Sequence, residues 1–199
     1  MYTATQIQQA QLRLGHKWFT KPFDLNVIAI RNTASNDPDH FNDDLRIIYN
    51  DANGQVHDES FACTTHPGLR ALLERKNSKG VAILVAGQQR GSHRVGLHKG
   101  RPSLVATRQL NVWRDGDKDG ELDPVALFRS GGSPVVWPDG TGIDIHSGHG
   151  PVVGNWSEGC ISVLDGGELR LIALMALQEQ AGHGDTISLT DRKSTRLNS

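Results

Sequence analysis

Residues 143–164, IDIHSGHGPVVGNWSEGCISVL, are the stretch that decides the fold, and they contain two side chains of chemical interest, His146 and Cys160. Residues 143–145 and 161–163 both alternate apolar, polar and apolar side chains, which predicts two short strands. The segment between them is rich in glycine and is expected to be a loop. His146 and Cys160 are too far apart to share a helix turn, but a strand, a loop and a return would bring them together.

This histidine and this cysteine together indicate covalent acyl transfer. A thiol becomes nucleophilic near neutral pH only where a base or a positive neighbour favours its thiolate. His146 could be that base for Cys160. Backbone N–H groups at Gly159 and Cys160 could stabilise the oxyanion of the intermediate. The alternative is a buried structural cysteine beside a surface histidine.

The composition excludes several classes of protein. The 199 residues are 37% hydrophobic and 22% charged, with a formal net charge of −1, so we expect a globular protein without a nucleic acid partner. No apolar run is long enough to predict a membrane span. The first residues lack the apolar core of a signal peptide, so we expect a protein that is cytoplasmic as synthesised. Two cysteines make no disulfide framework, and whether Cys63 pairs with Cys160 stays open.

Short strands separated by Gly/Asn turns predict a mostly β domain. Residues 45–49 and 55–64 flank an Asn/Gly-rich turn and predict a hairpin. Asp165, with a glutamate three residues later, is typical of a helix N-cap, and residues 169–180 then form the one convincing helix. We predict a single domain over residues 1–190, and a disordered or non-native tail over residues 191–199.

The chain resembles the L,D-transpeptidase catalytic domain family (YkuD-type). His146-Ser147 followed by Ser157-x-Gly159-Cys160 is similar to that family's signature of a histidine, a variable stretch and Ser/Thr-His-Gly-Cys. The resemblance extends over about residues 24–190, and flanking blocks look like those of uncharacterised phage and bacterial relatives. These blocks are CTTHPG at 63–68, GLHKG at 96–100, WRDGDKDG at 113–120 and GIDIH at 142–146.

The resemblance implies roles for individual residues. Cys160 would be the nucleophile, His146 its base, and Ser147 would orient the imidazole through its backbone carbonyl. Two positions differ from the family pattern: Glu158 replaces a second histidine, and Ser162 stands where the family has Asn or Arg. The residues expected to contact substrate or line its cleft are Ser157, Glu158, Ser162, Trp156, His149, Cys63 and His98.

The fold implied is a β-sandwich or barrel of the L,D-transpeptidase type, with one main helix after the cysteine strand. The activity implied is cleavage or cross-linking of peptidoglycan stem peptides through an acyl-enzyme on Cys160, with no cofactor required. Water as acceptor gives a peptidase or carboxypeptidase, and an amine gives a transpeptidase. The phage-like relatives favour a lysin that reaches the cell wall after phage-type release.

Two other classes of function remain open at this point. One is a catalytically inactive cell-wall-binding or phage structural module on the same fold. The other is a metal-dependent peptidase using His146, His149 and a further His or Asp. A zinc site needs three or four converging ligands, and the chain has no His-Glu-x-x-His or Cys-x-x-Cys motif. We therefore expect His93 and His98 to be scattered surface histidines.

An acidic segment matches the first part of a calcium loop. Asp115, Asp117, Asp119 and Asp123 occupy positions one, three, five and nine of that pattern. Position twelve is Ala126, where a calcium loop has a bidentate glutamate. The sequence therefore predicts either a structural calcium site or an acidic hairpin turn.

Overall fold

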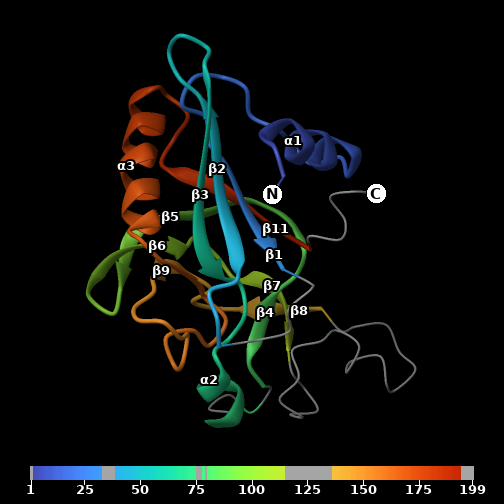
Figure 1. Cartoon of the computed structure of the whole chain (residues 1–199), viewed down its shortest axis with the longest axis vertical. Coiled ribbons are helices and arrows are strands. Elements are labelled where there is room, and N and C mark those ends of the chain that lie inside the picture. Colours follow the sequence, from blue (N-terminus) through green and yellow to red (C-terminus); the bar gives the residue numbers. More distant parts are fainter. Residues whose placement is uncertain (1, 33–38, 75–77, 79, 115–135, 194–199) are drawn as a thin grey trace.

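The computed structural model describes residues 2–32, 39–74, 78, 80–114 and 136–193 (Figure 1). Its helices are α1 (Ala4–Arg13), α2 (Leu69–Glu74) and α3 (Gly167–Gln180). Its strands are β1 (Asn26–Arg31), β2 (Asp43–Asn50), β3 (Val56–Thr64), β4 (Ala82–Leu84), β5 (Gly87–His98), β6 (Arg101–Ala106), β7 (Leu110–Arg114), β8 (Trp137–Gly140), β9 (Ile145–Ser147), β10 (Ile161–Val163) and β11 (Thr186–Lys193).

Within the described ranges, eight strands close into a barrel and three form a second sheet. The barrel order is β1-β11-β5-β6-β9-β10-β3-β2, and the second sheet runs β4-β7-β8. Figure 1 shows α3 and α1 on opposite flanks of the barrel, with α2 and the second sheet toward one end. Closure pairs both edges of the barrel sheet, so among the described strands only the second sheet has open edges, at β4 and β8.

Strand β1 is buried on both faces and joins the barrel core to α1. Val27 and Ala29 belong to the main apolar cluster inside the barrel. Ile28 and Ile30 point the other way and pack in a second cluster with Ile7 of α1. Successive side chains of a strand face opposite sides, so a continuous apolar run is the pattern that a strand covered on both sides requires.

The barrel places the two ends of the glycine-rich loop side by side. Strands β9 and β10 are parallel neighbours, with Ile145 opposite Ile161 and His146 opposite Ser162. Parallel neighbours need a crossover connection, and the loop between the two strands is that crossover. His146 on β9 and Cys160 immediately before β10 are therefore brought to the same end of the two strands.

The predicted mostly β architecture with one main helix is confirmed. The hairpin forms between β2 and β3, with Leu45 opposite Phe61, and the predicted helix is α3. The helix start is wrong in one respect: its N-cap is Gly166, in a left-handed conformation without a side-chain cap, and not Asp165. The glutamate at 168 lies in the first turn, where a negative charge favours the helix dipole.

The prediction that order ends at residue 190 is wrong by three residues. β11 continues to Lys193 and pairs in parallel with β1, with Asp191 opposite Ala29. The Asp191 carboxylate is fully buried and accepts a 2.6 Å hydrogen bond from Arg31. Asp191 and Arg192 are polar but buried, because their partners, Arg31 and the Ala10 carbonyl, come from distant parts of the chain. Residues 194–199 lie outside the described part of the chain.

None of the helices in the described ranges is long and apolar enough to cross a bilayer.

Removal of one partner of the buried Arg31–Asp191 pair is expected to be strongly destabilising. Arg31 also donates to Thr65 Oγ1 and to the Leu84 carbonyl. Its removal therefore leaves several buried acceptors without a donor. We predict that Arg31→Met lowers the free energy of unfolding by about 3–5 kcal/mol, measured by urea denaturation.

The exposed pair of Arg170 and Glu59 is the matched control for that substitution. These side chains are 43% and 25% exposed, so Arg170→Met should cost less than about 1 kcal/mol. Equal losses in the free energy of unfolding for the two substitutions would contradict the prediction that burial makes the Arg31 pair more costly to break.

Candidate active site

A tight turn delivers Cys160 to the start of β10. The Ser157 hydroxyl donates to the Cys160 carbonyl at 2.7 Å and accepts from the Gly159 N–H at 3.2 Å. Gly159 has a φ of 138°, and a side chain there would meet the Ala82 carbonyl oxygen at 2.6 Å. The turn therefore needs glycine at this position both for its backbone conformation and for the close approach of β4.

The Cys160 thiol is held in its neutral form. The side chain is buried, and Sγ donates to the Gly142 carbonyl at 3.0 Å. Burial raises the pKa of Cys160 to about 11, although the Asp144 backbone N–H, which hydrogen bonds the sulfur, acts in the opposite direction. At neutral pH Cys160 therefore rests as a thiol and not as a preformed thiolate.

His146 is a neutral imidazole whose basic nitrogen has no partner in the described part of the chain. Its Nδ1 lies 2.9 Å from the Ser147 carbonyl, which can only accept, so Nδ1 carries the proton and Nε2 the lone pair. Nε2 is buried without a hydrogen-bond partner among the described atoms. Burial lowers the pKa of His146, and the backbone hydrogen bond to Ser147 partly opposes this shift. The contact is the one that the family resemblance implies for Ser147.

A second histidine stacks on this imidazole. The rings of His98 and His146 are nearly parallel, 12° apart in plane with centroids separated by 4.7 Å. His98 Nδ1 lies 2.8 Å from Asp144 Oδ2, and Asp144 Oδ1 accepts from the Ala106 N–H at 2.9 Å. One ring nitrogen of each histidine and Cys160 Sγ all lie within 4.8 Å of one another.

The prediction of scattered surface histidines is therefore wrong for His93, which is fully buried with Nε2 2.8 Å from the Ile143 carbonyl. His98 lies in the site, where it was also expected as a residue of the substrate cleft. Sequence reasoning missed Asp144 altogether. The available signal was its spacing of two from His146 in a strand-like run, which places both side chains on one face.

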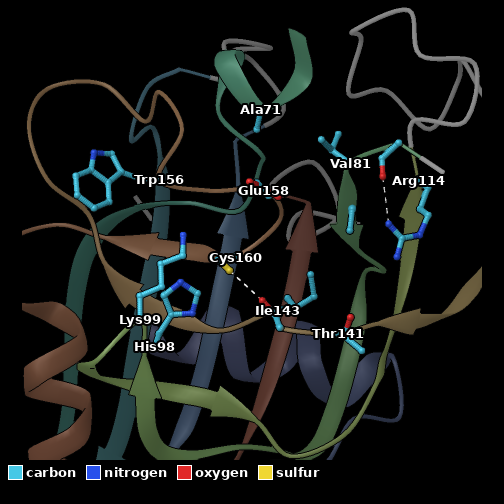
Figure 2. Close-up of a pocket in the computed structure, with 13 residues that line it drawn as sticks. Ala71, Val81, His98, Lys99, Arg114, Thr141, Ile143, Trp156, Glu158 and Cys160 are labelled. Atoms are coloured by element: carbon cyan, nitrogen blue, oxygen red, sulfur yellow. Dashed lines mark hydrogen bonds between the residues drawn. The ribbon is translucent and has the colours of Figure 1, made fainter. Parts of the chain in front are cut away.

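Cys160 opens into a cavity of about 280 Å³. Figure 2 shows His98 and Lys99 on one side of the sulfur, Arg114 on the other, and Glu158 beyond it toward α2. Trp156, which is 42% exposed, lines this cavity as the sequence predicted for a cleft wall. Ammonium, guanidinium and carboxylate groups together make the cavity suited to a ligand that carries both signs of charge.

A second cavity of about 210 Å³ adjoins the first and opens onto His146. Its lining residues are His98, Lys99, Arg101, Ser103, His146, Ser147 and Trp156. His98, Lys99 and Trp156 belong to both cavities. The thiol and its candidate base thus face neighbouring hollows, with His98 where the two meet.

Three of the predicted substrate contacts are wrong, because their side chains are inside the protein. Ser162 and Cys63 are both 0% exposed, and neither lines the two cavities at the site. Ser157 is also fully buried, and its hydroxyl is used to hold the cysteine turn. Cys63 and Cys160 are free cysteines, so the open question of their pairing is answered.

His149 lies beside the site but apart from the thiol. Its Nε2 is 2.7 Å from Arg101 Nη1 and 3.3 Å from Ser147 Oγ, and its ring packs edge-on against Trp156. The lone pair of Nε2 is therefore directed at a guanidinium. A metal peptidase was expected to use His146, His149 and a further ligand. The cluster found among the described residues instead contains His98, His146 and Cys160.

The predicted calcium ligands Asp115, Asp117, Asp119 and Asp123 lie outside the described residues.

Comparison with protein-family models, curated proteins and solved structures finds no match to this chain. The resemblance to L,D-transpeptidases rests on the sequence motifs alone.

The neutral thiol makes a specific prediction for chemical reactivity. Alkylation of Cys160 by iodoacetamide should accelerate about tenfold per pH unit between pH 7 and pH 10, without a plateau, since its pKa is about 11. Mass spectrometry of the labelled protein measures the rate.

Cys160→Ala is the control, because the remaining Cys63 is fully buried and should not react in the folded protein. A plateau below pH 8 would contradict the prediction and would indicate a thiolate paired with an imidazolium.

Proposed function

We propose that this protein is a cysteine-dependent acyl-transfer enzyme that acts on peptides of peptidoglycan. One observation carries the chemical part of this proposal. A neutral imidazole, oriented by the Ser147 carbonyl, lies beside a buried thiol at a cavity wall, and its buried Nε2 has no partner among the residues that the structure describes. A nucleophile, a base and a group that orients the base are the parts that covalent catalysis needs.

In the proposed reaction the thiol loses its proton only as it attacks. Cys160 turns from the Gly142 carbonyl and passes its proton to His146 Nε2 while Sγ bonds to the substrate carbonyl carbon. Collapse of the intermediate breaks the C–N bond, and His146 returns the proton to the leaving amine. Water or a second amine then attacks the thioester and gives a proton to His146. The C–S bond breaks, and His146 returns that proton to Sγ, which regenerates the thiol.

One of the two backbone N–H groups predicted to stabilise the oxyanion is already engaged. The Gly159 N–H already donates to Ser157 Oγ, so it is occupied in this structure. Lys99 lines both cavities, and Figure 2 shows its side chain extending beside Cys160. Its positive charge lowers the pKa of Cys160, which is the effect needed to stabilise an anion developing at the carbonyl.

The substrate class follows from the motif resemblance and is supported by the charges of the cavity. Lys99 and Arg114 can attract a carboxylate, while Glu158 can attract an ammonium group. A stem peptide that carries both groups fits such a lining. Glu158 replaces the second histidine of the family pattern, so we propose that it contacts the amine of the substrate.

Digestion of purified peptidoglycan, with mass spectrometry of the released and joined fragments, tests the proposal. The wild-type protein should yield new fragments or cross-links, Cys160→Ala should yield none, and His146→Gln should lose at least about a hundredfold in rate. Fragment masses identify the bond, and incorporation of an added amine separates transpeptidase from hydrolase.

His57→Gln is the matched control. His57 also stacks on an aromatic ring, Tyr49, and lies 3.1 Å from a carboxylate, Asp51, but it has no thiol beside it. It should retain wild-type activity. Full activity of Cys160→Ala would overturn thiol catalysis. Binding to peptidoglycan without any turnover by the folded wild-type protein would favour the inactive binding module.

A further inference from the structure

We propose that His98, His146 and Cys160 form a binding site for one Zn²⁺-class cation, and that this cation reversibly blocks the thiol. One ring nitrogen of each histidine and Cys160 Sγ lie within 4.8 Å of one another. Two imidazoles and a thiolate are ligands that zinc and similar borderline-soft ions prefer, whereas Mg²⁺ and Ca²⁺ prefer oxygen.

Both imidazoles are held as metal-binding histidines are held. His98 Nδ1 contacts Asp144 Oδ2 at 2.8 Å, and His146 Nδ1 contacts the Ser147 carbonyl at 2.9 Å. Histidine ligands of metals commonly donate one ring N–H to a carboxylate or a carbonyl, which fixes the tautomer and leaves the other nitrogen for the ion. Nε2 is therefore the available ligand atom on both rings.

A buried atom without a partner points to the missing ligand. His146 is only 5% exposed, and its Nε2 has no hydrogen-bond partner among the described atoms. A buried nitrogen lone pair without a partner is unfavourable, and a metal ion would satisfy it. The cavity of about 280 Å³ at Cys160 leaves room for water or a substrate atom as the fourth ligand.

The two rings stack within 12° of parallel, so one must turn for both Nε2 atoms to meet one ion. His98 is the ring that can turn. Its side chain is 20% exposed and it ends β5 at a tight hairpin, where the next residue, Lys99, has a φ of 50°. His146 is held within the barrel sheet between β6 and β10.

The charges around the cluster accommodate an ion. Lys99 and Arg114 oppose a cation, and Asp144 and Glu158 favour it. Binding converts the Cys160 thiol into a metal-bound thiolate and releases its proton to solvent, so a divalent ion adds one net positive charge to the cluster. Asp144, in direct contact with His98, compensates that charge.

The ion and the acyl-transfer chemistry exclude each other. A metal-bound thiolate has its lone pair engaged and His146 has lost its free nitrogen, so neither can act on a peptide. Metal binding does not depend on the proposed function; only the block of catalysis rests on it.

Titration of the full-length protein, freed of metal with a chelator and carrying no histidine tag, with Co²⁺ and then Zn²⁺ tests the site. We expect one ion per chain, a near-ultraviolet thiolate-to-cobalt absorption band, and about one proton released per ion at pH 7. Displacement of Co²⁺ by Zn²⁺ should remove the band. Cys160→Ser should abolish the band, and His98→Gln or Asp144→Asn should weaken binding by about 10–100-fold.

His57→Gln is again the control and should bind like the wild type, because its carboxylate-paired imidazole lies outside the cluster. Absence of a thiolate band, or a Kd for Zn²⁺ above about 100 µM, would overturn the proposal. An unchanged band in His98→Gln would overturn the assignment of His98.

Thiol alkylation with and without Zn²⁺ separates this proposal from the proposed function. Protection of Cys160 by Zn²⁺ supports the metal site. If the metal-free protein is alkylated but processes no peptidoglycan, the proposed function fails while the metal site stands. Activity that is insensitive to a saturating Zn²⁺ concentration contradicts the block.

Discussion

The site depends on Asp144, which holds the reactive groups in place through both its side chain and its backbone. Its carboxylate contacts His98 Nδ1 and accepts from the Ala106 N–H, which links the start of β9 to the β5–β6 hairpin. Its backbone N–H contacts the sulfur of Cys160, and its carbonyl accepts from the Ile161 N–H. One residue thereby positions the His98 imidazole, the Cys160 thiol and the first residue of β10. Because the carboxylate is mostly buried, these hydrogen bonds are costly to leave unmade.

Burial gives the thiol and its neighbouring imidazole matched electrostatic properties. It raises the pKa of Cys160 and lowers the pKa of His146, so both groups rest neutral near pH 7. A neutral pair differs from a preformed thiolate–imidazolium pair, because proton transfer must accompany attack. The same neutrality leaves a nitrogen lone pair beside a thiol. A metal site without its ion presents the same two groups. The proposed covalent catalysis and the proposed metal binding would therefore use the same arrangement of groups, and metal binding would also need His98.

The fold was predictable where local pattern and long-range packing agree. The hairpin of β2 and β3, the helix α3 and the short strands on either side of the glycine-rich loop all follow from periodicity and turn residues. The end of β11 was not predictable in this way. Its last residues are polar, and only the partner Arg31, far away along the chain, makes the burial of Asp191 favourable. Ser162 and Cys63 were expected at the cleft, but both are fully buried. Cys63 lies opposite Val163 in the barrel core, and Ser162, opposite Thr64, lies on the other face of the sheet.

By itself the sequence determined the chemical kinds of group that meet at the site. The approach of a histidine and a cysteine at the two ends of a glycine-rich loop can be inferred from the sequence, because the flanking strands and the loop are local features. Only the tertiary structure decided that His98 and Asp144 join them, because that contact needs barrel closure to bring β5 and β6 alongside β9. It also decided the protonation of the pair, since pKa values depend on burial, and burial is a property of the folded barrel and not of any short segment.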